Sequence, residues 1–410
     1  MSNTGNHKRV YLDYASTTPI DERVFKDMKP FMSERFGNPD SIHKEGVVAK
    51  EALRNARATV ARFFGAKPYE IVFTSSGTEA NNLAIFGITA GVTDNPRLMI
   101  RHTKLHAITT RIEHSSVLEA FRELERRGVV VTYLPVKADG IIDLAEFRKS
   151  LRPETFLVSI GYANNEIGAV QPIRKISSIL NECADKSYFT ISDSLRKIGR
   201  PVFHIDACQA ASYLPLKVES LGADLVSIDG SKSYGPKGIG ALYVRRGASL
   251  APIIFGGGQE FGFRSGTVPV YLAVGLARAL EICEAIRERE SKRLRKLRDF
   301  LYSQILENLR IDGVGRKVVT NGSMKERLPN NLNISLPDID TELLTLKLDT
   351  SGFAVSTKSA CLADERISYV VKALGRSDEE AASTLRITLG RFTALSDVKS
   401  FAETLRRCLK

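Results

Sequence analysis

The chain has 410 residues, of which 43% are hydrophobic and 26% charged, which is typical of a soluble globular protein of two or three domains. No apolar run reaches the roughly 18 residues that a membrane span requires, and the first residues lack the apolar segment of a secretion signal, so we expect a cytoplasmic protein without membrane contacts. The net charge of +12 would suit tRNA or acidic partners, but mixed-sign helical stretches such as 288–298 also explain it, and without a nucleic-acid-binding motif we expect no direct nucleic-acid binding.

Short, mostly continuous apolar runs alternate with amphipathic helical patterns such as Val47–Phe64 and Ser115–Arg127. Continuous apolar runs are typical of strands covered on both faces. The alternation predicts a doubly wound α/β fold with a seven-stranded, mainly parallel sheet flanked by helices. The expected strands are Ile71–Thr74, Ala107–Thr110, Val129–Val136, Phe156–Ala163, Phe203–Ala207, Asp224–Asp229 and Ile239–Arg245.

A long helical pattern from about Tyr271 to Leu309 follows the last of these strands. It predicts an exit into a smaller C-terminal α+β domain, which would contain strands near Asn331–Leu336 and Leu385–Leu389. We therefore expect a large domain over residues 22–270 and a small domain made of residues 1–21 and 271–410. The irregular stretch 184–200 is expected to be a surface excursion.

Polar residues follow the predicted strands, at the sheet edge where open α/β sheets bind ligands. Gly77 and Thr78 open a helix directly after a strand, which suits a phosphate, although the same residues make an ordinary helix cap. His114 follows the next strand and would stack on a planar ring or move protons, unless it is a cap or core histidine. Asn165 would bond a phenolic oxygen or a carboxylate, unless it serves the turn.

Asp206 and Lys232 follow two further strands, with Gln209 close to the aspartate. A carboxylate that holds a pyridinium nitrogen and an amine that bonds to an aldehyde are the two side chains that pyridoxal 5'-phosphate chemistry needs. Burial would help the lysine to lose its proton. The alternative is a surface lysine in a Gly-rich turn. Downstream, a second Gly-rich stretch ends at Thr267.

The five cysteines are scattered without a C-x-x-C pair, so we expect neither a metal site nor a disulfide framework. Cys361 lies in the small, polar stretch 355–362, which reads as a loop. A thiol on a loop is a candidate nucleophile, although an incidental surface cysteine is the simpler explanation of the residue alone. Arg386 would fork onto a substrate carboxylate, unless it forms a surface ion pair.

Together these residues resemble the NifS-type cysteine desulfurases, over nearly the whole chain. The resemblance is carried by collinear motifs: F-G-N-P-D-S-I-H-K-E-G, T-S-S-G-T-E-A-N-N-L-A-I, E-H-S-S-V-L, N-N-E-I-G-A-V-Q, H-I-D-A-C-Q, Y-G-P-K-G-I-G-A-L-Y-V, R-S-G-T and S-A-C. It implies the aspartate-aminotransferase-like fold (pyridoxal phosphate fold type I) and a homodimer. It also implies a sulfur acceptor protein, either an iron–sulfur scaffold or a tRNA-thiolation enzyme.

The resemblance also implies residue roles. Lys232 would hold the cofactor covalently, Asp206 would face its ring nitrogen, Gln209 and Asn165 would bond its ring oxygen, and His114 would stack on the ring. Gly77, Thr78 and Ser231 would bind the phosphate, with Thr267 reaching it from the partner subunit. Arg386 would hold the carboxylate of L-cysteine. Cys361 would take the sulfur as a persulfide, releasing L-alanine.

Two positions depart from the family pattern. Asp229 and Ser231 stand where members commonly carry a small residue such as Ser and a His. A carboxylate facing a phosphate is repulsive, so either the Asp229 side chain turns away or cofactor binding is weaker than usual. These departures leave open a cofactor-poor relative that acts as a scaffold or binding protein. A second alternative, from the same fold, is a selenocysteine lyase or other lyase.

Overall fold

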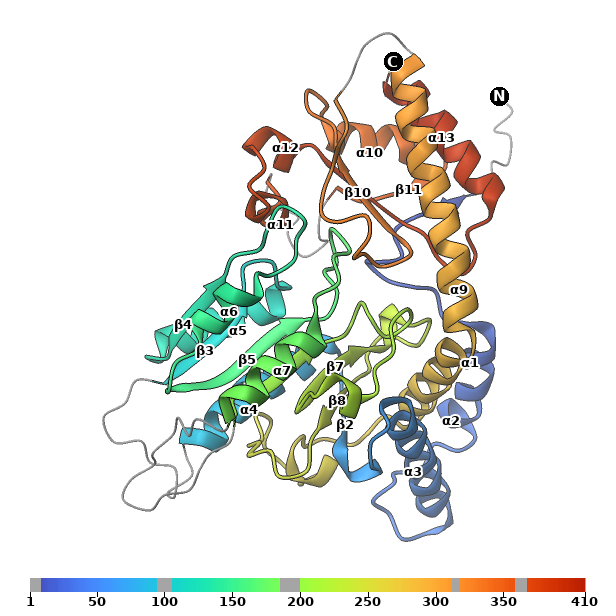
Figure 1. Cartoon of the computed structure of the whole chain (residues 1–410). Helices are drawn as coiled ribbons and strands as arrows, with labels where there is room; N and C mark the ends of the chain where they lie inside the picture. Colours follow the sequence, from blue (N-terminus) through green and yellow to red (C-terminus); the bar gives the residue numbers. More distant parts are fainter. Residues whose placement is uncertain (1–8, 94–104, 185–199, 312–316, 358–366, 410) are drawn as a thin grey trace.

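A computed structural model describes residues 9–93, 105–184, 200–311, 317–357 and 367–409 of the chain. Its centre is a seven-stranded sheet with the strand order β2-β8-β7-β6-β5-β3-β4 (Figure 1). All neighbouring strands run parallel except at β8, which is antiparallel to both β2 and β7. The strands are β2 (Ile71–Thr74), β3 (His106–Thr110), β4 (Val130–Leu134), β5 (Thr155–Gly161), β6 (Val202–Asp206), β7 (Leu225–Asp229) and β8 (Gly240–Val244).

Helices cover both faces of this sheet, because successive side chains of each strand point to opposite sides. On β2, Val72 packs with helices α4 and α5, whereas Ile71 and Phe73 pack with α3, α7 and α9. The covering helices are α3 (Lys44–Phe64), α4 (Gly77–Thr93), α5 (Ser115–Arg126), α7 (Ile173–Ala184) and α9 (Val270–Ile311). This two-sided burial explains why the strands read as continuous apolar runs.

The remaining elements of the large sheet region are short. Most of them connect the strands or precede α3 along the chain. They are α1 (Glu22–Met28), α2 (Pro30–Ser33), η1 (Pro68–Glu70), α6 (Leu144–Ser150), α8 (Val218–Leu221), η3 (Gly230–Lys232) and η4 (Glu260–Gly262).

Helix α9 spans 42 residues and runs from the central sheet to a second, smaller group of elements (Figure 1). That group has a three-stranded antiparallel sheet in the order β12-β10-β9 and a parallel pair of β1 with β11. The first strand of the chain therefore pairs with the C-terminal part. The elements are β1 (Val10–Tyr11), β9 (Val319–Thr320), β10 (Asn331–Ser335), α10 (Thr341–Thr350), β11 (Phe353–Ala354), α11 (Tyr369–Ala373), α12 (Asp378–Ala382), β12 (Thr384–Thr388) and α13 (Leu395–Leu409).

These elements confirm the predicted fold class: a seven-stranded, mainly parallel sheet flanked by helices. The predicted strand and helix boundaries lie within three residues of those observed. The division into domains at residues 21 and 270 stays a prediction. The excursion expected over 184–200 lies mostly in residues 185–199, outside the described residues.

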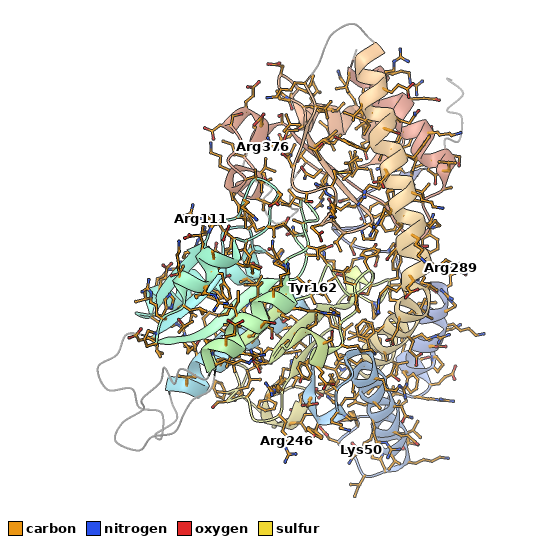
Figure 2. All side chains as sticks on the ribbon, viewed as in Figure 1. Lys50, Arg111, Tyr162, Arg246, Arg289 and Arg376 are labelled. Carbon is orange, nitrogen blue, oxygen red and sulfur yellow. The ribbon has the colours of Figure 1, made fainter. Side chains whose placement is uncertain are left out.

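Charged side chains project from many elements rather than gathering at one place (Figure 2). The exposed basic residues Lys50, Arg246 and Arg289 lie on α3, after β8 and on α9. Several basic side chains of the helices pair with acidic ones, as Arg293 does with Glu290 on α9. Within the described part of the chain, no helix combines the length and apolar character needed to cross a bilayer.

Candidate active site

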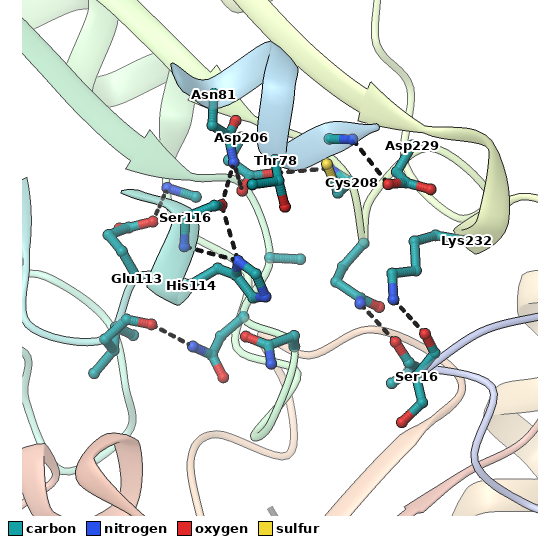
Figure 3. A pocket seen from close by; sticks show the side chains of 18 of the residues that line it. Ser16, Thr78, Asn81, Glu113, His114, Ser116, Asp206, Cys208, Asp229 and Lys232 are labelled. Atoms are coloured by element: carbon teal, nitrogen blue, oxygen red, sulfur yellow. Dashed lines mark hydrogen bonds between the residues drawn. The ribbon is translucent and has the colours of Figure 1, made fainter. Parts of the chain in front are cut away.

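A cavity of about 220 Å³ opens at the carboxyl edge of the central sheet. Segments that follow β2, β3, β5, β6 and β7 line it, together with Arg386 from β12 and the chain just after β1 (Figure 3). Nine of the residues predicted from the sequence to form the site lie in its wall. They are Gly77, Thr78, His114, Asn165, Asp206, Gln209, Asp229, Lys232 and Arg386.

Asp206, the last residue of β6, is buried in the wall of this cavity. Its Oδ1 accepts a hydrogen bond from the Cys208 amide at 2.9 Å, and its Oδ2 accepts one from Asn81 Nδ2 at 2.8 Å. One donor on each oxygen fixes the orientation of the carboxylate. Asp206 is therefore a fixed negative charge facing the cavity.

Lys232 ends the short turn η3, which follows β7 directly. Its side chain reaches into the cavity, where Nζ donates to the backbone carbonyl of Ser16 (Figure 3). Gln209 also contacts this N-terminal segment, since its Nε2 donates to the Ala15 carbonyl at 2.9 Å. The residues just after β1 thus form one wall of the site.

The Asp229 carboxylate lies at the start of helix α4. Its Oδ2 accepts from the Gly77 amide at 2.8 Å, and its Oδ1 accepts from the Ser231 amide at 2.8 Å and from the Ser231 hydroxyl at 2.6 Å. A Cβ on Gly77 would come within 2.5 Å of Cys208 Sγ, so only glycine fits there. The Asp229 side chain therefore points to the first amide of α4, and its effect on a bound phosphate stays a prediction.

His114 caps helix α5. Its Nδ1 accepts from the Ser116 amide at 3.1 Å and lies 2.9 Å from the Ser116 hydroxyl. Because Nδ1 is the acceptor, the neutral ring carries its proton on Nε2. The alternative of a helix cap is confirmed, while the role against a planar ring or in proton transfer stays a prediction for a side chain that lines the cavity.

Glu113 is buried directly beside His114 in the cavity wall. Its Oε2 accepts from the Gly161 amide at 2.8 Å, and its Oε1 lies 2.6 Å from the Thr110 hydroxyl. Burial raises the pKa of this carboxyl from 4.5 to about 8, and the negative charge of Asp206 adds to the effect. At neutral pH Glu113 is therefore mostly protonated.

Arg386 is buried, with only 1% of its surface exposed, so the alternative of a surface ion pair is wrong. Its NH2 group donates to Asp13 Oδ1 at 2.8 Å and to Ser16 Oγ at 2.7 Å, and NH1 donates to the Asn165 carbonyl at 3.1 Å. Its Nε has no hydrogen-bond partner among the described residues. A buried guanidinium at the cavity with an unused donor suits an anionic ligand.

Two predicted residues, Ser231 and Thr267, lie outside the cavity wall, and a third is not among the described residues. Ser231 turns its hydroxyl to Asp229, as described above. Thr267 is exposed in the segment that follows η4. Cys361 falls in residues 358–366, outside the described residues.

Several lining residues were missed in the sequence. Asn81 lies one turn after Gly77 on α4 and therefore faces the same side, a signal that could have been used. The sequence around Ser16 and Cys208 contains no comparable signal that would place these residues in the cavity. Among the described residues, no group of three His, Cys, Asp or Glu side chains is arranged to hold a metal ion.

Comparison with known proteins gives consistent matches. The sequence model of the family Aminotransferase class-V matches residues 10–401. The chain is 39% identical over 404 residues to a cysteine desulfurase IscS of Dictyoglomus turgidum, covering 98% of this chain and 95% of that protein. It is 44% identical over 401 residues to a cysteine desulfurase IscS of Neisseria meningitidis serogroup C, covering 97% and 91%.

Solved structures agree with these matches. A NifS-like protein superposes with a TM-score of 0.86 at 34% identity, covering 98% of this chain and 99% of that one. A structure described as SspA in complex with cysteine superposes with a TM-score of 0.74 at 35% identity, covering 94% and 99%. Since the family model and the relatives both span nearly the whole chain, the protein belongs to the class-V aminotransferase family.

Proposed function

We propose that this protein is a pyridoxal 5'-phosphate-dependent cysteine desulfurase, which converts L-cysteine to L-alanine and transfers the sulfur to its own Cys361. The observation that carries the proposal is that Asp206, Lys232 and Arg386 line one cavity. Relatives named cysteine desulfurase at 39% and 44% identity support it over the alternatives of a selenocysteine lyase and a scaffold protein.

The residues of the cavity fit this cofactor, which the family uses. Lys232 would hold it covalently, and Asp206, already fixed by two donors, would face its ring nitrogen. When bound, the cofactor supplies an electron sink for cleavage of the carbon–sulfur bond. The other cofactor contacts that we propose are His114 against the ring, Asn165 and Gln209 at the ring oxygen, and Gly77, Thr78, Asp229 and Ser231 at the phosphate end, with Thr267 of a second subunit.

The other proposed roles belong to side chains around the substrate. Arg386 would bind the carboxylate of L-cysteine through its fork, and its unused Nε supports this role. His114 would move protons at Nε2, because its Nδ1 is held by the helix cap. The Cys361 thiol would take the sulfur atom, so that cysteine and thiol become alanine and a persulfide with all atoms conserved.

We propose that the active form is a homodimer. Large apolar side chains are exposed near the start of α3 and around η4, and burial in a partner would remove them from water. They include Phe36, Ile42, Val47, Phe255 and Phe261.

The η4 segment itself is held rigidly on the sheet. The Glu260 carboxylate accepts two hydrogen bonds of 2.6 Å from Arg57 and one of 2.7 Å from the Phe73 amide. Such anchoring would fix the nearby Thr267 for contact with a second subunit.

Further parts of the proposal concern context. We place the enzyme in the cytoplasm and expect its persulfide to pass to an iron–sulfur scaffold or a tRNA-thiolation enzyme. We also propose the domain division at residues 21 and 270, which the pairing of β1 with β11 supports.

The test is mass spectrometry of the purified protein after incubation with L-cysteine. We expect one additional sulfur atom on the peptide that contains Cys361, together with yellow protein and release of alanine. Cys361→Ser should keep the colour and lose sulfide release, and Lys232→Ala should lose the colour. Undiminished sulfide release by Cys361→Ser would remove this thiol from the mechanism.

A further inference from the structure

The phosphate end of the cavity already contains an anion that belongs to the chain. Among the residues proposed to bind the phosphate, Gly77 in the cavity wall offers its amide, and Ser231 outside that wall offers its amide and its hydroxyl. All three donate to the Asp229 carboxylate, at 2.8, 2.8 and 2.6 Å. Both oxygens of the carboxylate therefore already use donors that a phosphate could otherwise use.

The position is also electrostatically suited to one anion. Gly77 is the first residue of the 17-residue helix α4, whose N-terminus carries partial positive charge. A carboxylate that accepts the first amide uses this charge. A phosphate brought to the same amide would meet the carboxylate at short range, where like charges repel.

Asp229 is in addition tied to the turn that positions the reactive amine. It is the N-cap of η3, the turn that ends at Lys232. If a phosphate took the two Ser231 donors, the turn would lose its cap. Release of Asp229 and the orientation of Lys232 are therefore linked.

We propose that Asp229 acts as a built-in substitute for the cofactor phosphate, so that this chain gains little affinity from the phosphate group and binds pyridoxal nearly as well as pyridoxal 5'-phosphate. The inference rests on the proposed cofactor. It makes Asp229 a specificity-determining residue, whose charge sets the preference between the two forms of the vitamin.

The test is an equilibrium titration of full-length, cofactor-stripped protein with each of the two aldehydes, followed by the absorbance of the adduct with Lys232. For the wild type we expect the two dissociation constants to agree within about tenfold. In Asp229→Ser we expect the affinity for pyridoxal 5'-phosphate to rise by about tenfold or more, since one repulsive charge is removed. The affinity for pyridoxal should change by less than about threefold, since pyridoxal has no phosphate to repel.

Two further variants separate charge from structure. Asp229→Asn keeps the size of the side chain and removes its charge, so it should shift the preference in the same direction. Glu79→Gln removes a charge from the same turn of α4, but that carboxylate is paired with Arg264 at 2.7 Å and should leave the preference unchanged. Equal changes for both aldehydes in Asp229→Ser, or a wild type that prefers the phosphorylated form by more than about tenfold, would overturn the inference.

A second readout does not depend on the cofactor. Inorganic phosphate should raise the melting temperature of Asp229→Ser and leave that of the wild type unchanged. If no variant forms a coloured adduct with either aldehyde, the proposed function fails, and the phosphate measurement alone decides the role of Asp229. Equal stabilisation of both proteins by phosphate, or of neither, would refute that role.

Discussion

Glu113→Gln should make the protein more stable at neutral pH. The buried carboxyl has a pKa of about 8 in the folded protein, against 4.5 for an exposed one. Its stabilising contribution is therefore complete below pH 4.5 and is lost as the pH rises through 8. Between pH 4.5 and pH 7 the free energy of unfolding falls by about 1.36 kcal/mol for each pH unit. The loss at pH 7 is therefore about 3 kcal/mol.

Glutamine avoids this loss because it does not ionise and fits the same hydrogen bonds. Its oxygen can accept from the Gly161 amide, and its nitrogen can donate to the Thr110 hydroxyl. We therefore expect the variant to exceed the wild type in free energy of unfolding by about 3 kcal/mol at pH 7, and by nothing near pH 4.5.

The assay is urea unfolding at a series of pH values, with the protein and cofactor concentrations held constant. Infrared spectroscopy at pH 7 should show a protonated carboxyl band that Glu113→Gln lacks. The control is Glu119→Gln, an exposed carboxyl on helix α5, which begins two residues after Glu113; it should change stability by less than about 0.5 kcal/mol at every pH. The raised pKa of Glu113 would be refuted if Glu113→Gln and the wild type had the same free energy of unfolding at pH 8. It would also be refuted if the difference between them did not shrink towards pH 4.5.

Two further predictions concern the buried arginines. Arg386→Lys should raise KM for cysteine by about tenfold or more, because a lysine lacks the two parallel donors with which a guanidinium binds a carboxylate. Steady-state kinetics would contradict this if kcat fell and KM stayed constant. Arg57→Ala should cost about 3–5 kcal/mol of stability by leaving the Glu260 carboxylate buried without its partner. The double variant Arg57→Met with Glu260→Gln should recover most of that loss, measured by urea titration. No recovery would show that the packing of Arg57 between Phe73 and Phe261 matters more for stability than its charge.

Much of the site could be predicted because parallel strands bring their carboxyl ends to one edge. His114, Asp206 and Lys232 lie at or just after the ends of three different strands and are far apart in the sequence. Their common edge follows from the apolar runs alone. The resemblance to a known family then supplied their roles.

Other features depend on contacts that no local pattern encodes. Ser16 enters the cavity because β1 pairs with β11 and carries the N-terminal segment past Lys232. Arg386 is buried because Asp13 of the same segment compensates its charge. The direction of the Asp229 side chain is set by the Gly77 amide, which comes from a different part of the chain. Each of these is a tertiary interaction between distant residues.

Ser16 contacts two of the residues that we propose to act in the reaction, Lys232 and Arg386. Its carbonyl accepts from Lys232, and its hydroxyl accepts from Arg386 at 2.7 Å. A single small residue near the N-terminus thus adjoins the amine through its backbone and the guanidinium through its side chain. Substitution of this one residue would therefore change the surroundings of the guanidinium, and so which amino acid binds, without altering the helices or the main sheet.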